Sequence, residues 1–162
     1  MCGFGATISI NGRYGFQDWV TQNFSSQGCD AVGLYVYASE SAQADQAPTA
    51  DAVNWSMDGL LDEMFSSLQQ RGWDGRQVPL IGIVQAFGGA RSDSPAYRVV
   101  PNAKAVETQS DSFCAHGASG LVFYGWNDSS FGPATQTPLN NGGIATGIRN
   151  GIAACQHHWG TA

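Results

Sequence analysis

Pro79-Leu-Ile-Gly-Ile-Val-Gln-Ala-Phe87 is the stretch that decides the fold of this chain. It is an almost unbroken apolar run, which is typical of a strand buried on both faces of a parallel sheet, and it ends in an amide and an aromatic side chain. Ala31-Val-Gly-Leu-Tyr-Val-Tyr37 and Gly120-Leu-Val-Phe-Tyr-Gly-Trp126 have the same form. The sequence therefore predicts hydrogen-bonding and stacking groups at the carboxyl ends of parallel strands, where α/β folds build binding sites.

A helical pattern follows each predicted strand. With Gly5-Ala-Thr-Ile-Ser-Ile10 as a further strand, we expect strands at 5–10, 31–37, 79–87 and 120–126. Apolar residues at helical spacing predict helices at about 16–26, between 51 and 72, and at about 102–116 and 143–157. Gly28, Gly72 and Gly117 follow three of these helices, as C-terminal glycines commonly do. Four strand–helix units in a row predict a single α/β domain over 1–162, with a parallel sheet and right-handed crossovers.

The connections between these elements differ in length. Helix-to-strand connections are short, whereas strand-to-helix connections are long at 38–50, 88–100 and 127–142. In parallel α/β folds the strand-to-helix loops carry the site, because they lie at the carboxyl ends of the strands. We therefore expect that end of the sheet to be functional and the other end to be scaffold.

The charge of the chain argues against a nucleic-acid partner. The net charge is -6, and Lys104 is the one lysine among seven basic residues. Binding to a phosphate backbone needs clustered positive charge, and so does binding to an anionic membrane surface. No stretch approaches the roughly 20 apolar residues that span a bilayer. We expect neither nucleic acid nor membrane as a partner.

Four cysteines set the expectations about metals and redox state. Cys2, Cys29, Cys114 and Cys155 lack the C-x-x-C spacing of zinc sites, and the histidines lack the i, i+4 spacing of a helical metal site, so we expect no metal and no cofactor. In an exported protein Cys2 would pair with Cys29, and Cys114 with Cys155; free buried thiols are the alternative. The N-terminus shows no signal peptide. The disulfide-compatible pattern nevertheless favours a secreted or extracellular protein.

Two motifs in the second half of the chain, Gly82-Ile-Val-Gln-Ala-Phe-Gly-Gly89 and Phe123-Tyr-Gly-Trp-Asn127, resemble the last two strands of TIM-barrel glycoside hydrolases and related carbohydrate-active barrels. The turn Ala115-His-Gly-Ala-Ser-Gly-Leu121 is similar to the turn that introduces the eighth strand in those barrels. The resemblance covers residues 75–156 and extends only weakly to the first half.

The resemblance implies a half-barrel. A complete TIM barrel has eight strand–helix units in roughly 200 to 250 residues, whereas this pattern offers half of them. The chain would then be a (βα)4 unit, the C-terminal half of a TIM barrel, completed by a second copy in a homodimer or by a missing half in a longer chain. An open sheet is the remaining alternative. We favour a completed barrel, because a lone half-barrel exposes two sheet edges and half of an apolar interior.

Catalysis in the resembled barrels depends on two carboxylates about 5 to 5.5 Å apart. They stand at the ends of the fourth and seventh strands; here the seventh-strand position carries Gln85, an amide that cannot act as a nucleophile, and the fourth strand is absent. The pair is therefore not carried over. Glu40 and Asp128 are the candidate catalytic residues, because each follows its strand within a few residues and a carboxylate can transfer protons. Solvated loop acids are the alternative.

Sugar recognition is expected from aromatic and polar side chains at the strand ends. Trp126 offers a flat apolar platform for a sugar ring and an N–H for a hydroxyl, with strand–helix packing as the alternative. The candidate substrate-binding residues are Gln85, Trp126, Tyr37, Asn127, Arg91 and Asp93.

The sequence leaves two hypotheses about function, both with an oligo- or polysaccharide as the partner. The first is a carbohydrate-active hydrolase in which Glu40 or Asp128 transfers the proton. The second is a non-catalytic carbohydrate-binding or interaction module derived from a glycosidase barrel, which the missing carboxylate pair favours. We lean towards the enzyme, because a homodimer would bring duplicate acidic residues around one barrel mouth.

Overall fold

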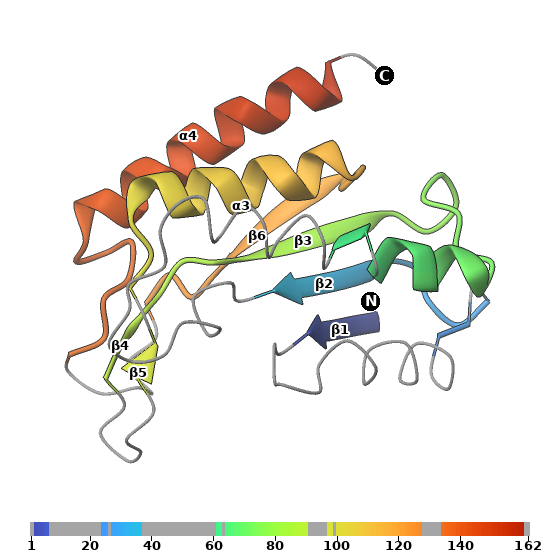
Figure 1. Ribbon diagram of the computed structural model, residues 1–162, viewed down its shortest axis with the longest axis horizontal. Coiled ribbons are helices and arrows are strands. Elements are labelled where there is room, and N and C mark those ends of the chain that lie inside the picture. Colours follow the sequence, from blue (N-terminus) through green and yellow to red (C-terminus); the bar gives the residue numbers. More distant parts are fainter. Residues whose placement is uncertain are drawn as a thin grey trace.

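The computed structural model describes residues 2–6, 24–25, 27–36, 61–62, 64–90, 97–98, 100–127 and 134–160. Within these segments the chain is an α/β structure in which helices pack on a parallel sheet (Figure 1). This confirms the α/β class and the parallel sheet predicted from the sequence.

The sheet has four strands: β1 (Cys2–Ala6), β2 (Val32–Val36), β3 (Leu80–Gln85) and β6 (Gly120–Tyr124). Their order in the sheet is β1-β2-β3-β6, and every neighbouring pair is parallel. Each new strand is therefore added beside the previous one, always in the same direction across the sheet.

A second, two-stranded antiparallel sheet lies in the long connection after β3. It consists of β4 (Gly89–Ala90) and β5 (Tyr97–Arg98). The sequence predicts only a polar loop at 88–100, because these strands are two residues long and leave no periodic pattern.

The position of the first strand differs from the prediction. We expected residues 5–10, but β1 is Cys2–Ala6, and residues 7–10 lie outside the described segments. Tertiary contacts place it: Cys2 is disulfide-bonded to Cys29, and its backbone N–H donates to the carbonyl of Ala31 at 2.9 Å. These contacts hold the chain beside the start of β2, although the glycines of β1 have low strand propensity.

The helices agree well with the predicted pattern. Residues 61–62 and 64–70 are helical, α3 is Ala103–Ala115 and α4 is Gly142–Trp159. Gly72 and Gly117 have positive φ angles of 81° and 92°, a conformation that glycine adopts without a steric penalty, and each follows its helix as predicted. The predicted helix at 16–26 lies mostly outside the described residues, and Phe24 and Ser25 are not helical.

Asparagine side chains begin both C-terminal helices. The Oδ1 atom of Asn102 accepts from the backbone N–H of Ala105 at 2.8 Å, and the Oδ1 atom of Asn141 accepts from those of Gly143 and Ile144. Such caps satisfy amides that have no partner within the helix.

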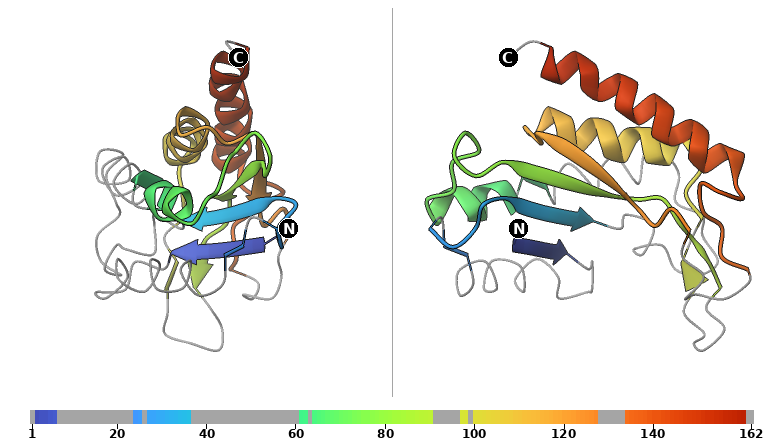
Figure 2. Two further views of the ribbon diagram at one scale, coloured as in Figure 1. Left: turned by 90° about the vertical axis from the view of Figure 1, so that its right-hand side faces the viewer. Right: turned by 180° about the vertical axis from the view of Figure 1, so that it is seen from behind.

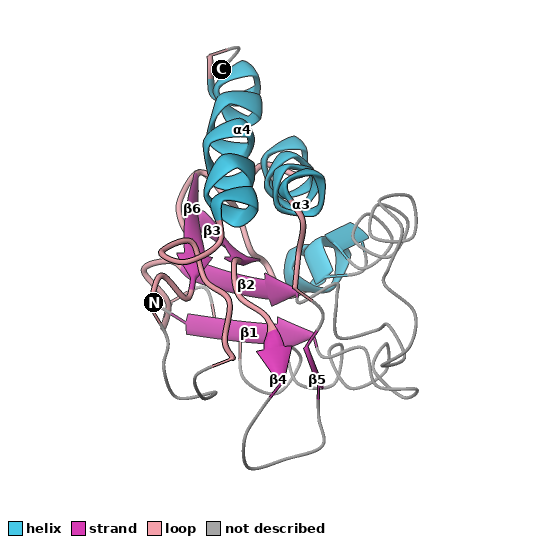
Figure 3. Ribbon diagram, turned by 90° about the vertical axis from the view of Figure 1, so that its left-hand side faces the viewer, coloured by secondary structure: helices cyan, strands magenta, loops and turns pink. Residues whose placement is uncertain are grey.

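The helices cover one face of the sheet. Figures 2 and 3 show the helix at 61–70, α3 and α4 in a row on the same side. Val32 and Leu34 of β2 and Leu80 and Val84 of β3 point to this side and are fully buried among apolar residues of the helices. At Gly82 the sheet and α3 approach so closely that a Cβ would lie 2.6 Å from the ring of Phe113.

Close packing also joins α3 to α4. A Cβ at Gly147 would lie 2.6 Å from the carbonyl oxygen of Ala103, and one at Gly151 would lie 2.6 Å from the Cβ of Ser110. The two helices meet where α4 carries glycines, so their backbones come close enough for a disulfide between Cys114 and Cys155.

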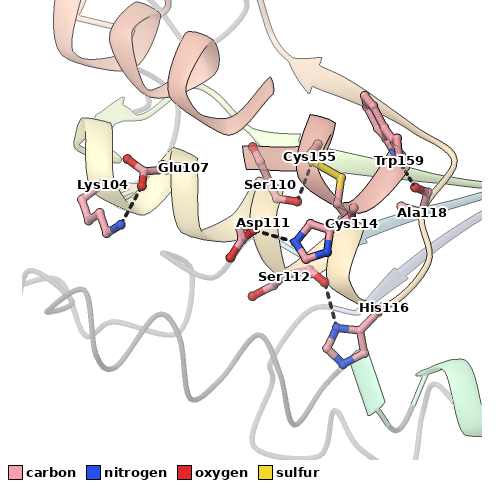
Figure 4. A network of polar contacts seen from close by, with 11 residues as sticks. Lys104, Glu107, Ser110, Asp111, Ser112, Cys114, His116, Ala118, Cys155 and Trp159 are labelled. Atoms are coloured by element: carbon pink, nitrogen blue, oxygen red, sulfur yellow. Dashed lines mark hydrogen bonds and ion pairs between the residues drawn. A yellow bond between two sulfur atoms is a disulfide. The ribbon is translucent and has the colours of Figure 1, made fainter. Parts of the chain in front are cut away.

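Polar contacts surround this disulfide (Figure 4). His158 Nε2 lies 2.9 Å from Asp111 Oδ1. Trp159 Nε1 donates to the carbonyl of Ala118 at 2.7 Å, which fixes the end of α4 over the turn before β6. Further along α3, Lys104 donates to Glu107 at 2.7 Å, and this hydrogen bond holds the pKa of the Glu107 carboxyl below its ordinary value.

We expect Gly147→Ala to destabilise the protein by about 1–2 kcal/mol. Overpacking against backbone atoms of α3 costs about 1–3 kcal/mol, and the better helix propensity of alanine returns at most about 1 kcal/mol. Gly142→Ala is the matched control: it lies at the start of the same helix with no atom within 4 Å of its added Cβ, so its free energy of unfolding should not fall. Urea denaturation of both variants measures this; equal stabilities would contradict the close helix contact.

We expect the variant Cys114→Ala/Cys155→Ala to lose about 2–4 kcal/mol of unfolding free energy under oxidising conditions. The bond joins residues 41 apart in sequence, and a cross-link over such a loop lowers the entropy of the unfolded chain. Thermal denaturation with and without a reductant tests the reason. The reductant also breaks the bond between Cys2 and Cys29, so parent and variant should become equally stable in it, whereas a variant as stable as the oxidised parent without reductant would refute the contribution.

Candidate functional site

The strands end together at one edge of the sheet. Gln85 of β3 is in register with Tyr124 of β6, and Val84 is in register with Val36 of β2. Beyond this edge the backbone N–H of Ala86 donates to the carbonyl of Tyr124 at 2.6 Å, so the chains leaving β3 and β6 stay together. The peptide bond from Tyr124 to Gly125 is cis.

Gln85 lies at the carboxyl end of β3, as the sequence predicts, but it is fully buried. Its Nε2 atom donates to the carbonyl of Phe87 at 2.9 Å. The amide thus holds the first residues of the following loop. A direct contact with a ligand hydroxyl, which we expected from the sequence, would require the side chain to become exposed.

An aromatic pair lies beside Gln85, which bonds to the carbonyl of Phe87 and is in register with Tyr124. The rings of Phe87 and Tyr124 meet edge to face, with centroids 5.4 Å apart and planes at 88°. This is a favourable geometry for two aromatic rings, and it holds the Tyr124 side chain in place at the carboxyl edge of the sheet. Phe87 is buried, whereas Tyr124 is 42% exposed. The buried ring of Phe87 therefore packs against a Tyr124 side chain that solvent can reach.

The loops after β3 and β6 are joined to each other. Gly88 and Gln136 exchange two backbone hydrogen bonds, of 3.0 and 2.8 Å. Gln136 in turn accepts from Asn141 Nδ2 at 2.6 Å, which connects the bridge to the first turn of α4. A Cβ at Gly89, whose φ is 128°, would lie 2.7 Å from the carbonyl oxygen of Ala134. The two long connections predicted to form the functional end therefore do lie side by side.

Large side chains are exposed near both ends of the connection from β6 to α4. Trp126, one residue beyond the cis peptide bond, is 59% exposed, and Leu139 is exposed in the segment that leads to α4. Asn127 is also exposed beside Trp126. The predicted placement of Trp126 at the carboxyl end of the last strand is thus what the structure has, and its indole is not buried between strand and helix.

Sequence reasoning missed Tyr124 as a site residue. It precedes Trp126 by two residues, and the alternation of Val122 and Tyr124 along β6 was the available signal. Both side chains point away from the helices, on the face where they are exposed.

Five of the eight predicted site residues fall outside the described segments. They are Tyr37, Glu40, Arg91, Asp93 and Asp128. The structure therefore brings together Gln85, Trp126 and Asn127 at one end of the sheet and makes no statement about the candidate carboxylates.

The described part of the chain offers neither a metal cluster nor a membrane-spanning helix. No three His, Cys, Asp or Glu side chains gather there as ligands for a metal ion. The helices of the same segments are too short or too polar to cross a bilayer. What the described site offers chemically is stacking and hydrogen bonding.

No protein-family model, curated protein or solved structure matches this chain.

We expect Gln85→Met to lower the free energy of unfolding by about 1–3 kcal/mol, because it leaves the buried carbonyl of Phe87 without the amide donor. Methionine has nearly the same length, so the change in packed volume is small. Gln156→Met is the matched control on the exposed side of α4 and should be neutral within about 0.5 kcal/mol. Chemical denaturation compares the two, and a neutral Gln85→Met would show that this hydrogen bond does not support the loop.

Proposed function

We propose that this chain is a half-barrel of the (βα)4 type that binds an oligo- or polysaccharide across the carboxyl ends of its strands and acts as a glycosidase-like hydrolase. The strand order supports the half-barrel. Strands follow one another across the sheet in chain order with the described helices on one face, whereas doubly wound folds reverse direction and cover both faces.

The exposed aromatic surface at the strand ends is the observation that carries the proposal. Trp126 and Tyr124 present apolar ring faces to solvent, although burying such rings is favourable. A sugar ring has an apolar C–H face that can cover an aromatic ring and hydroxyls that accept from an indole N–H. The exposed amide of Asn127 lies next in sequence to Trp126 and would bind a hydroxyl.

Gln85 takes a supporting role in this proposal. Its bond to the Phe87 carbonyl holds the ring that packs against Tyr124. Gln85, at the seventh-strand position of the resembled barrels, thus stabilises the exposed aromatic surface and does not itself contact the sugar.

Proton transfer is assigned to Glu40 or Asp128, which follow the second and fourth strands of the predicted order at the same end of the sheet. Tyr37, Arg91 and Asp93 are proposed as further ligand contacts from the neighbouring loops. The protein is proposed to work outside the cell, where the pairs Cys2–Cys29 and Cys114–Cys155 would stay oxidised.

Binding tests the platform directly. We expect Trp126→Ala to weaken binding of soluble oligosaccharides at least about tenfold, or roughly 1.4 kcal/mol, measured by calorimetry against a panel of neutral glycans. Trp73→Ala is the control, because that partly buried tryptophan lies in the segment before β3, at the other end of the sheet, and donates to the carbonyl of Val78. Equal losses of binding affinity in both folded variants would point to a general structural effect and reject Trp126 as the sugar-binding platform.

Turnover separates the hydrolase from a non-catalytic carbohydrate-binding module. Release of reducing sugar is measured for the parent, Glu40→Gln and Asp128→Asn on the glycans that bind. A catalytic acid should lose about 100-fold or more in rate when it becomes an amide. Binding without turnover in the parent would reject the hydrolase and leave the module as the function.

A further inference from the structure

The exposed large apolar side chains of the described segments all belong to the last strand–helix unit. They are Val122, Tyr124, Trp126, Leu139, Ile152 and Trp159, and their exposed fractions run from 39% to 63%. The described residues of the first three units contribute none. Among the described residues, these side chains set the last strand–helix unit apart from the first three.

That side is an edge of the sheet. β6 pairs with β3, and no strand in the described segments pairs with its other side. Val122 and Tyr124 point, next to this edge, to the face of the sheet on which no helix of the described segments lies (Figure 3). Parallel strands are normally buried on both faces and paired on both sides, so β6 has the composition of an inner strand in the position of an outer one.

The flank of α4 has the same character. Gly147, Asn150 and Gly151 face α3, with Asn150 Nδ2 bonded to Glu107 at 3.2 Å. At about 100° per residue, Ile152 lies on the side of α4 turned away from Gly147 and Asn150, whereas Trp159 reaches the turn between α3 and β6 through its bond to Ala118. A missing neighbour of this unit would therefore be a parallel strand with a helix on the same face as α4.

We propose that the neighbour is a second copy of this chain, whose β1 pairs with β6 in parallel. β1 is the opposite edge of the same sheet, so a two-fold axis along the strands places β6 of each copy beside β1 of the other. Two copies of the four-stranded sheet then close at the eight strands of a TIM barrel, and the faces that carry no described helix become its interior.

The exposed area is of the size that such an interface needs. Six large side chains exposed by about half amount to on the order of 500 Å² of apolar surface. A standard interface buries about 800 Å² on each partner, so these side chains would supply more than half of it and the edge backbone and polar rim the remainder.

The dimer would also complete the site. Tyr124 and Trp126 stand at the carboxyl end of β6, so the carboxyl end of β1 of the second copy would lie beside them. This inference rests on the sheet edge and not on the proposed sugar ligand. Loss of glycan binding with dimerisation intact would reject only the function, whereas a monomer that binds glycans would reject only the dimer.

Sedimentation equilibrium of the full chain tests the proposal over about 1 to 100 μM. The parent should sediment at twice the mass of one chain, and Val122→Lys should weaken dimerisation at least about tenfold, because it places a charge in the closed interior. Gln70→Lys is the control: it adds the same side chain at an exposed position on the helix before β3 and should leave the dimer unchanged.

Hydrogen exchange keeps the test decisive if Val122→Lys fails to fold. In the parent, amides of the peptide covering β6 should exchange at least about tenfold more slowly in the dimer than after dilution, because pairing with β1 protects them. A parent that stays monomeric throughout the range would overturn the proposal. So would a dimer whose β6 amides exchange as fast as in the monomer, or one that a folded Val122→Lys leaves unchanged.

Discussion

A parallel sheet is stable only where both of its faces are covered, and the structure of this chain depends on that constraint. One face is covered by the chain's own helices, which bury Leu34, Leu80 and Val84 completely. The close approach at Gly82 lets the ring of Phe113 lie directly on β3. The other face carries Val122 and Tyr124, no helix of the described segments lies over it, and the proposed dimer is the means of covering it.

The same arrangement determines where a ligand can bind. Parallel strands that follow one another in chain order send every strand-to-helix loop to the same edge, so the loops after β3 and β6 meet there. The bridge between Gly88 and Gln136 gives this edge a fixed backbone. Phe87 and Gln85 stabilise it from inside, and Tyr124 and Trp126 are the aromatic groups left exposed there, which the proposed function assigns to the ligand.

Glycines let elements of the fold approach closely, and disulfides then join them. Gly147 and Gly151 let α4 lie against α3, and the bond between Cys114 and Cys155 then ties the two helices. The bond between Cys2 and Cys29 does the same for β1, whose own sequence has little preference for a strand. The first and last units of the sheet are therefore the two that covalent bonds hold in place.

The sequence by itself determined the class of the fold, three of the four strands, the ends of α3 and α4, and the placement of Trp126 at a strand end. These features are local: hydrophobic period and C-terminal glycines are read within a few residues. Cysteine spacing allowed both disulfide pairs but left free thiols open as well.

Only the tertiary structure decided the start of β1, the burial of Gln85, the role of Tyr124 and the gathering of exposed apolar residues on the last unit. Each depends on residues far apart in sequence: Cys29 and Ala31 position β1, and the bond to Phe87 turns Gln85 inwards. Burial and pairing are properties of neighbours in space, so no local pattern along the chain could supply them.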